Sequence, residues 1–258
     1  MLRALRTAAL GMSAQQNSVD NTANNLANAN TTGFKRSTVV FQDLLYQSVQ
    51  RGGEGEQRPA ALQLGTGAAV VATQRTFLQG TLTQTGNSLD LGINGEGFLQ
   101  ARRPDGTIVY TRDGTFTLEA TGRVVTQSGL TLEPDLEVPP ETQEIQISGD
   151  GIVRVRLQDE PEPLEIGQIE VAQFSNPAGL RSIGGNFYEQ TEASGEPQIG
   201  PPAEGGAGLL QQGFLEASNV DVVQEMVDLI TAQRAYEMNS KMITTSEEML
   251  QIANGMKR

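Results

Sequence analysis

The two ends of the chain carry apolar residues at alternating three- and four-residue spacing, the pattern of a helix with one apolar face. In the N-terminal segment the stripe consists of small and apolar side chains, interrupted by Gln16: Leu2, Leu5, Ala9, Met12, Val19, Ala23 and Leu26. Thr31, Thr32 and Gly33 end the pattern, and a glycine suits a helix C-terminus. The sequence therefore predicts an N-terminal helix within residues 1–33.

The C-terminal segment, residues 215–258, repeats this pattern over a broader arc. One stripe consists of Ala235, Met238, Met242, Thr245, Met249, Ile252 and Met256. A second stripe lies beside it on the helix and consists of Val222, Met226, Leu229, Tyr236, Ile243 and Leu250. Asn219 and Asp221 are candidate N-caps for this helix. Because its apolar arc is broad, we expect the helix to contact more than one neighbour.

Asparagine is concentrated in the N-terminal helix although it is a mediocre helix former. Residues 17–30 contain six of them, and four repeat the three-and-four spacing: Asn17, Asn21, Asn24 and Asn28. In a packed bundle such amides can hydrogen-bond across subunits and specify register. We take this as the hypothesis, and a polar stripe that merely faces solvent remains the alternative.

The middle of the chain has short Thr-, Val- and Leu-rich runs separated by turn residues. Asp105-Gly106 and Asp113-Gly114 are hairpin signals, and two strands are expected around Gly149-Asp150-Gly151 within residues 145–157. Another strand is expected over residues 166–174. We predict an antiparallel β domain over residues 76–192.

Two connecting segments complete the predicted organisation. Residues 34–75 read as an extended connecting or hairpin segment that includes the Gly-rich run 51–59, and residues 193–214 read as a Gly/Pro-rich return linker. The expected fold is α+β. Long N- and C-terminal helices form a coiled-coil-like pair, and the β domain is inserted between them.

The composition excludes enzyme sites that depend on Cys or His and leaves carboxylate and Ser–Lys chemistry open. The sequence has no Cys and no His, which removes thiol nucleophiles, metal sites built on these residues and every His-containing triad. The Asp residues of the middle segment lie outside the alternating pattern of a calcium loop. We therefore expect no catalytic, cofactor-binding or metal-binding residues and no enzyme activity.

The net charge and the hydropathy limit which classes of partner are expected. A formal net charge of −13 argues against nucleic acid or an anionic membrane as a partner. No run is long and apolar enough for membrane insertion, and no secretory signal is visible. We expect either a cytoplasmic protein or one exported by a route that needs no cleaved signal peptide.

Four segments resemble one known family. ANNLANANTTGFKRS, residues 23–37, resembles the N-terminal signature of the bacterial flagellar axial proteins, the rod, hook and hook-associated subunits. Residues 215–250, from LEASNVD to TTSEEML, are similar to the C-terminal signature of that family. LDLGINGEGFLQ and YTRDGTFTLEATGRVV resemble segments of its shared β domain. The residues that match the two signatures are Asn25, Asn30, Gly33, Phe34, Asn219, Val220, Gln233 and Arg234.

Within the family the chain is most similar to the subunits of the distal rod. Its length suits them, and residues 41–64 resemble the extension that distinguishes the distal rod from the hook. The resemblance implies that this extension makes the rod straight and stiff, so deletion of residues 47–61 is expected to give a more flexible, hook-like polymer. A proximal rod or hook-type subunit is the alternative within the family. A secreted β-domain protein, adhesin-like or degradative, with oligomerising helical termini is the alternative outside it.

The resemblance implies a structural function. The subunits are expected to form a helical homopolymer, the drive shaft that transmits motor torque through the periplasm and the outer-membrane zone to the hook. The implied partners are the proximal rod proteins, the hook protein, the peptidoglycan-layer and outer-membrane ring proteins, and the flagellar type III export apparatus. The terminal helices are expected to be largely disordered in the free monomer and to fold on assembly.

Overall fold

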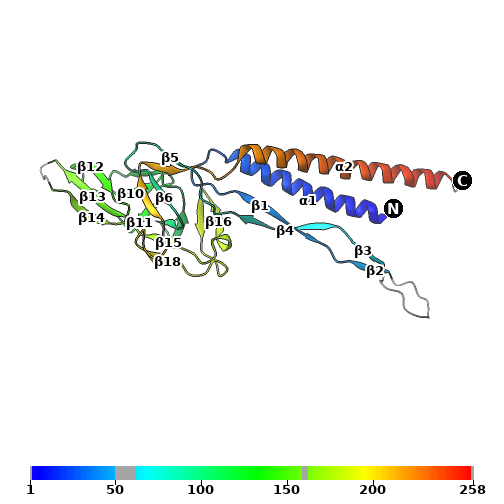
Figure 1. Ribbon diagram of the computed structural model, residues 1–258, viewed down its shortest axis with the longest axis horizontal. Coiled ribbons are helices and arrows are strands. Elements are labelled where there is room, and N and C mark those ends of the chain that lie inside the picture. Colours follow the sequence, from blue (N-terminus) through cyan, green and yellow to red (C-terminus); the bar gives the residue numbers. More distant parts are fainter. Residues whose placement is uncertain (1, 50–61, 159–161, 257–258) are drawn as a thin grey trace. The chain divides into compact units, whose positions relative to one another are not determined.

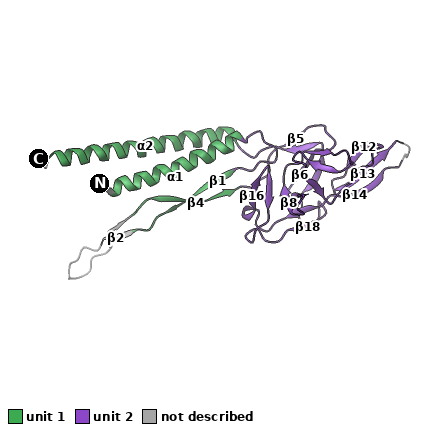
Figure 2. Ribbon diagram, turned by 180° about the vertical axis from the view of Figure 1, so that it is seen from behind, with its two compact units in different colours: residues 1–27, 37–75, 221–258 green, residues 28–36, 76–220 purple. Residues whose placement is uncertain are grey.

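The computed structural model describes residues 2–49, 62–158 and 162–256. The chain divides into two compact units, which Figure 2 colours separately. Unit 1 consists of residues 1–27, 37–75 and 221–258, and unit 2 consists of residues 28–36 and 76–220. Both α-helices lie in unit 1, and unit 2 is built mainly from antiparallel strands. The predicted α+β class is therefore confirmed.

Unit 1 contains two long helices, α1 (Leu2–Ala27) and α2 (Val222–Gly255), which lie side by side (Figure 1). Asn25 contacts Glu225, and Gly11 lies against Asn239. From the first contact to the second, the residue number falls by fourteen on α1 and rises by fourteen on α2, so the helices are antiparallel. The coiled-coil geometry expected for this pair stays a prediction.

The two helices begin and end for local reasons. The Asp221 side chain caps α2 by accepting hydrogen bonds from the N–H groups of Val223 and Gln224, so Asp221 is the N-cap and Asn219 is not. α1 ends at Ala27, earlier than the predicted Gly33. Gly33 has φ +66° and lies in the segment that follows the helix.

Unit 1 also contains a long two-stranded ribbon. Its strands are β1 (Ser37–Asp43) paired with β4 (Ala68–Arg75), and β2 (Gln47–Val49) paired with β3 (Leu62–Leu64). The pairing of Asp43 with Ala68 continues in step to Gln47 with Leu64, so the two pairs form one antiparallel ribbon, of which β1 and β4 contact α1. The predicted Gly-rich run 51–59 lies outside the described residues.

Unit 2, the β body, is built around one large antiparallel sheet with the strand order β16-β17-β8-β7-β11-β10-β9. Strand β15 pairs with β7, and β18 pairs with β15. The bounds of these strands are β7 Phe98–Arg102, β8 Ile108–Thr111, β9 Phe116–Leu118, β10 Val124–Thr126, β11 Thr131–Glu133, β15 Val171–Gln173, β16 Arg181–Gly184, β17 Phe187–Glu189 and β18 Gln198–Gly200. A short 3-10 helix, η1 (Pro177–Gly179), precedes β16.

Smaller sheets complete the β body. Strands β12 (Thr142–Ile147), β13 (Ile152–Leu157) and β14 (Leu164–Gln168) form a three-stranded sheet. Strand β19 (Leu209–Gln212) pairs with β6 (Leu91–Asn94), and β20 (Phe214–Glu216) pairs with β5 (Leu82–Gln84). The predicted hairpins at Asp105-Gly106 and at residues 145–157 are confirmed by the pairs β7–β8 and β12–β13.

Three expectations for the β body are corrected. Residues 166–174 form parts of two strands, β14 and β15, rather than one. Asp113-Gly114 is not a hairpin turn, because β8 pairs with β7 and β17 and not with β9. Gly114 instead lets two backbones approach, since a Cβ atom there would lie 1.7 Å from the Leu91 oxygen. The segment 193–214, expected as a linker, contributes β18 and β19, and its glycines and prolines form the turns between them.

The core of the β body lies between these sheets. One apolar cluster is centred on Leu99, Phe116 and Val155, which have no exposed surface. A second cluster contains Phe98, Phe174 and Tyr188, whose rings meet edge to face, with centroids 5.7 Å apart for Phe98 and Phe174 and 6.0 Å apart for Phe98 and Tyr188. These edge-to-face ring contacts help to fix the sheet.

Candidate assembly surfaces

The face by which α2 contacts α1 is made of small and polar residues. The buried residues of α2 are Glu225, Ala232 and Ser246, and Asn239 lies between them against Gly11. These four positions are seven residues apart. The buried residues of α1 are likewise small or polar: Ala8, Ala14, Thr22 and Asn25. The helix pair therefore closes without using most of its large apolar side chains.

Most of the large apolar residues of α2 remain at the surface. In the first predicted stripe, Met238 and Ile252 are each 64% exposed, Met242 is 55% exposed, and Met249 and Met256 are also exposed. Ala235 is partly buried and Thr245 is exposed. In the second stripe, Leu229, Ile243 and Leu250 are partly buried, whereas Val222, Met226 and Tyr236 are exposed. Val223, Val227 and Ile230, which neither predicted stripe includes, are exposed as well.

The predicted stripe of α1 is divided in the same way. Leu5, Met12, Val19 and Leu26 are partly buried, and Ala9 and Ala23 are exposed. Nothing is described for the Leu2 side chain. None of the described stripe residues of α1 is fully buried within unit 1, so each of them keeps apolar surface that a neighbour can cover.

The asparagines divide into two groups with different roles. Asn25, which is 1% exposed, donates from Nδ2 to the Ser37 carbonyl (2.8 Å) and to Glu225 Oε2 (3.2 Å), and accepts from the Ser37 N–H (3.0 Å). Asn21 donates to the same carbonyl at 2.7 Å and accepts from the Ser37 hydroxyl. Together they fix the start of β1 against α1, and Asn25 joins that point to α2.

The other asparagines are not used in this way. Asn17 is exposed and donates to the Ser13 carbonyl of its own helix at 3.0 Å. Asn28 accepts from the Thr31 hydroxyl in the turn after α1. Asn24 and Asn30 are exposed. Within the predicted stripe, Asn21 binds the start of β1, while the most buried amide belongs to Asn25, which the spacing did not select.

The β body contains a buried charged cluster where the chain enters and leaves it. Lys35 (0% exposed), Arg112 (4%) and Glu216 (1%) meet there. Glu216 Oε1 accepts from Lys35 Nζ and from the Gly80 N–H (2.8 Å), and Oε2 accepts from Arg112 Nη1 at 3.3 Å. Lys35 also donates to the Leu78 carbonyl at 2.8 Å. One carboxylate therefore balances two cations.

Burial dominates the electrostatics of this cluster. It lowers the pKa of Lys35 because the charged ammonium is removed from water; Glu216 opposes the shift and Arg112 adds to it. Burial also lowers the pKa of Arg112, whose guanidinium lies 5.3 Å from the centre of the Phe98 ring. Because Glu216 pairs with both cations, the stability of buried Lys35 and Arg112 depends on its carboxylate.

Asn219 ties the three chain segments that meet beside this cluster. Its Oδ1 accepts from the Arg36 N–H at 2.7 Å, and its Nδ2 donates to the carbonyls of Thr76 (2.9 Å) and Leu78 (3.0 Å). We call Lys35, Arg36, Thr76, Leu78, Arg112, Glu216 and Asn219 the junction cluster. It joins three chain segments, residues 35–36, 76–78 and 216–219, at the place where the chain enters and leaves the β body.

The remaining signature residues have mixed environments. Gly33 packs against the Arg112 and Asp113 backbone and donates its N–H to the Glu216 carbonyl, and Phe34 is buried. Val220 is partly buried, and Gln233 and Arg234 are exposed on α2. Lys35, Arg112 and Glu216 were missed at the sequence level. The adjacency of Lys35 to the matched Phe34 was the available signal for one of them.

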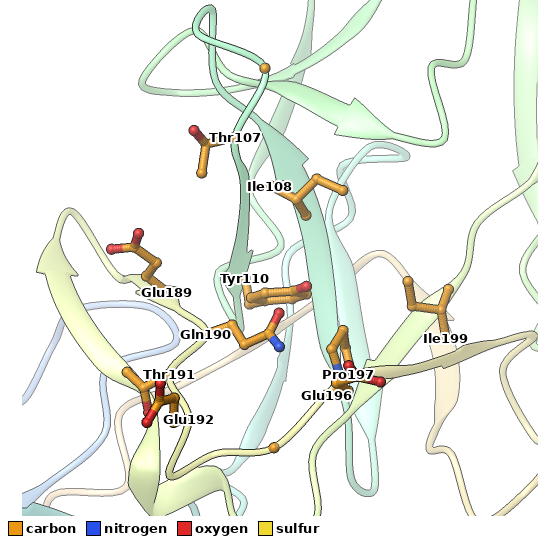
Figure 3. Close-up of a pocket in the computed structure, with 12 residues that line it drawn as sticks. Thr107, Ile108, Tyr110, Glu189, Gln190, Thr191, Glu192, Glu196, Pro197 and Ile199 are labelled. Atoms are coloured by element: carbon orange, nitrogen blue, oxygen red, sulfur yellow. The ribbon is translucent and has the colours of Figure 1, made fainter.

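The β body also carries a hollow of about 950 Å³ (Figure 3). Tyr110 of β8, Glu189 of β17 and Ile199 of β18 come from three strands to line it. Burial raises the pKa of Tyr110, and Glu189 is paired with Arg181. Among the described residues, no group of three or more acidic side chains is placed to hold a metal ion, and no helix is long and apolar enough to cross a membrane.

Comparison with known proteins identifies the family of the chain. Residues 5–35 match the model of the flagella basal body rod protein, residues 92–155 the D1 domain of the flagellar hook protein FlgE/F/G, and residues 211–256 the C-terminal region of the flagellar basal body rod FlgEFG proteins. The matches cover both helical ends and part of the β body.

Full-length relatives agree with these matches. The flagellar basal-body rod protein FlgG of Borreliella burgdorferi is 48% identical over 100% of both chains. The FlgG protein of Buchnera aphidicola is 46% identical over 97% of this chain and 98% of its own, and that of Caulobacter vibrioides is 45% identical over 99% and 100%. Similarity of this extent, together with the two exposed helical faces, shows that the chain belongs to the family of flagellar basal-body rod proteins.

Proposed function

We propose that the chain polymerises helically into the distal rod of the flagellar basal body, with the exposed faces of α1 and α2 as its main subunit contacts. The family is structural, so the expectation that the chain is not an enzyme is confirmed by its relatives. The observation that carries the proposal is the distribution of side chains on α2. Small and polar residues face α1, and methionine and branched apolar residues face outward.

Exposed apolar surface of this extent favours association. Soluble monomers rarely keep a contiguous stripe of large apolar side chains at their surface. Burying one such side chain in full contributes roughly 1.5–3 kcal/mol before the entropic cost of association is subtracted. Met238, Met242, Met249 and Ile252 alone therefore represent a gain of several kcal/mol for each subunit added.

The spacing of the buried positions supports a coiled-coil-like pair. Glu225, Ala232, Asn239 and Ser246 repeat every seven residues, and Gly11 and Asn25 of α1 contact two of them. Seven-residue repeats keep one face toward a partner helix over several turns. Small residues at this seam bring the two helices close together and leave the remaining faces for neighbouring subunits.

The same distribution supports folding on assembly. A helix pair joined mainly by small and polar residues buries little apolar area, and helical stability in water comes mostly from packing of an apolar face. We therefore infer that α1 and α2 are largely disordered in the free monomer and become ordered in the polymer. Rigid, fully protected termini in hydrogen-exchange measurements on the monomer would contradict this.

The ribbon supports the assignment to a straight rod. It exposes Phe41 (44%), Leu45 (89%) and Tyr46 (58%), and an isolated two-stranded ribbon is marginally stable in water. We infer that these side chains are covered by neighbouring subunits, which would stiffen the polymer. Deletion of residues 47–61, of which 50–61 lie outside the described residues, is expected to give a more flexible, hook-like polymer. An equally straight polymer would contradict the inference.

The partners follow from the place of a distal rod in the flagellum. They comprise the proximal rod proteins on one side, the hook protein on the other, and the peptidoglycan-layer and outer-membrane ring proteins around the shaft. Delivery through the flagellar type III export apparatus would place the subunit in the periplasm and the outer-membrane zone without a cleaved signal peptide.

Electron microscopy of purified protein tests the proposal. The wild type is expected to form tubes, and Met242→Asp is expected to prevent them because it places a charge on the outward apolar face. Gln251→Asp places the same charge at an exposed polar position of α2 and serves as the control. Tubes formed by Met242→Asp as readily as by Gln251→Asp would exclude this face as a contact surface.

A further inference from the structure

Methionine is confined to the two ends of this chain. Of the seven methionines, Met1 and Met12 lie at the N-terminal end and the other five lie at or beyond residue 226, so the β body contains none. The chain also lacks Cys, Trp and His. The thioethers are therefore its most easily oxidised side chains, and they are concentrated in the segments that carry the proposed contacts.

Three of these methionines share one side of α2, and a fourth, Met256, is its C-cap residue. Met238 is 64% exposed, Met242 55%, Met249 46% and Met256 79%. They are spaced by four, seven and seven residues, so they lie along one stripe, which we call the methionine face. None of the four is among the residues buried against α1. An oxidant can therefore reach them in a subunit that is not yet assembled.

The thioether can be oxidised to a polar group, and this would change the polarity of the methionine face. The flexible, polarisable chain of the thioether adapts to irregular apolar surfaces, which suits a helix that contacts several neighbours. The sulfur lone pair attacks a peroxide oxygen, so the S–O bond forms and the O–O bond breaks. The hydroxyl now bound to sulfur passes its proton to the departing hydroxide, which gives the sulfoxide and water. The sulfur is oxidised by two electrons and the peroxide is reduced. The sulfoxide is polar and chiral, and its oxygen needs a hydrogen-bond donor when it is buried.

We propose that the methionine face is an oxidation-sensitive modification site. Peroxide converts its methionines to sulfoxides in the free subunit and blocks polymerisation, and polymerisation protects them. The inference rests on the proposed function, because it requires that a second copy of this chain covers the face. It adds a reversible chemical control, since methionine sulfoxide reductases restore the thioether.

The test uses the full chain purified as monomer. Samples are treated with graded hydrogen peroxide, the modified residues are mapped by peptide mass spectrometry, and polymer is quantified by sedimentation and electron microscopy. Oxidation of the methionine face is expected to lower polymer yield at least tenfold, and treatment with the A and B classes of sulfoxide reductase is expected to restore it. In preformed polymer the same residues are expected to oxidise at least tenfold more slowly than in the monomer.

Two variants make the test specific. Replacing all four residues, Met238→Leu, Met242→Leu, Met249→Leu and Met256→Leu, keeps apolar volume but removes the thioethers, so this variant is expected to polymerise with and without peroxide. The matched control, Met12→Leu with Met226→Leu, is expected to remain sensitive. If the four-residue variant does not assemble, reductase treatment of the oxidised wild type decides the question without it.

The outcomes separate the two proposals. Failure of untreated wild type to polymerise would overturn the proposed function, and this inference with it. Normal polymerisation of wild type whose methionine face is fully oxidised would overturn the inference alone. Persistent peroxide sensitivity of a polymerising four-residue variant, or a loss of assembly that the reductases do not reverse, would overturn it as well.

Discussion

Asn25 of α1 donates a hydrogen bond to Glu225 of α2 at 3.2 Å, and each residue is only 1% exposed. The same amide also binds the Ser37 backbone at the start of β1. One side chain therefore joins both helices and the ribbon of unit 1. A buried polar contact of this kind is costly when it is half broken, because the remaining groups lose both water and partner.

Asn25→Ala is expected to weaken assembly strongly. It removes the hydrogen bonds to Ser37 and Glu225, and leaving such groups unsatisfied costs about 2 kcal/mol or more. A loss of about 2 kcal/mol raises the critical concentration for polymerisation roughly 30-fold. Asn17→Ala is the control, since Asn17 is exposed and bonds only within its own helix turn. Equal critical concentrations for the two variants, measured by sedimentation, would contradict this role.

Asn24→Leu is expected to impair polymerisation while the β body stays folded. Asn24 is exposed in unit 1, so water can replace hydrogen bonds that its amide loses in the monomer, whereas an amide buried against a neighbouring subunit has no such replacement. Asn28→Leu is expected to act in the same direction, with an added cost because Asn28 accepts from Thr31.

The conservative variant Asn24→Gln, which keeps an amide, sharpens this test. It should assemble better than Asn24→Leu if hydrogen bonding across subunits matters. Near-UV circular dichroism reports the β body in each variant. Normal motility of cells carrying Asn24→Leu and Asn28→Leu would assign the stripe to ordinary surface.

Removal of Glu216 is expected to be the most damaging change in the junction cluster. Glu216→Gln leaves Lys35 and Arg112 buried without the carboxylate that both contact, and breaking a buried pair in this way costs about 3–5 kcal/mol. Lys35→Met should cost less, because Glu216 keeps Arg112 as partner. The exposed pair between Arg102 and Glu133 provides the control, and Glu133→Gln should cost less than about 1 kcal/mol.

Denaturant unfolding of the β body at neutral pH measures all three free energies. The expected order of destabilisation is Glu216→Gln, then Lys35→Met, then Glu133→Gln. If Lys35→Met proved more damaging than Glu216→Gln, the argument that Lys35 and Arg112 both depend on the Glu216 carboxylate would be wrong.

Because of Lys35, the free energy of unfolding is expected to change with pH in the alkaline range. The pKa of Lys35 in the folded protein is lowered by burial below its ordinary value of 10.5, so between these two values the unfolded chain binds more protons than the folded one. The Lys35 contribution to the free energy of unfolding therefore increases as pH rises through its folded pKa toward 10.5. The slope cannot exceed about 1.4 kcal/mol per pH unit for one group.

The comparison with Lys35→Met isolates this effect. The difference in unfolding free energy, wild type minus variant, should become more favourable to the wild type across that alkaline window. A difference that becomes less favourable as pH rises would show that the pKa of Lys35 is raised, contrary to the dominance of burial.

The helical ends, the β body and the family could all be predicted from sequence because each rests on a repeated local signal. Periodicity identified α1 and α2, and Asp-Gly turns identified two hairpins. Periodicity failed where a position is defined by a distant partner. The spacing of Asn21 and Asn24 placed them in one stripe, yet Asn21 binds Ser37 and Asn24 is exposed.

Distant partners also explain why the charged cluster of Lys35, Arg112 and Glu216 was missed and why residues 193–214 were taken for a linker. Lys35 and Glu216 are 181 positions apart in the chain, and nothing in either local sequence indicates that both become buried. Residues 193–214 look like a linker because their turns are rich in Gly and Pro. Leu210 nevertheless lies in the core at 3% exposure, since β19 pairs with β6 from the other end of the β body sequence.

The junction cluster has a consequence for the modularity of the chain. Because Asn219 donates to the Thr76 carbonyl, the two ends of segment 76–220, which makes up most of the β body, lie next to each other. Domains whose ends are adjacent can be inserted into, or removed from, a host chain with little disturbance of the host. The helical ends and the ribbon thus form one part of the chain, into which the β body is inserted as a domain that can be replaced. Engineered flagellar subunits could carry a different domain with closely spaced termini at this point.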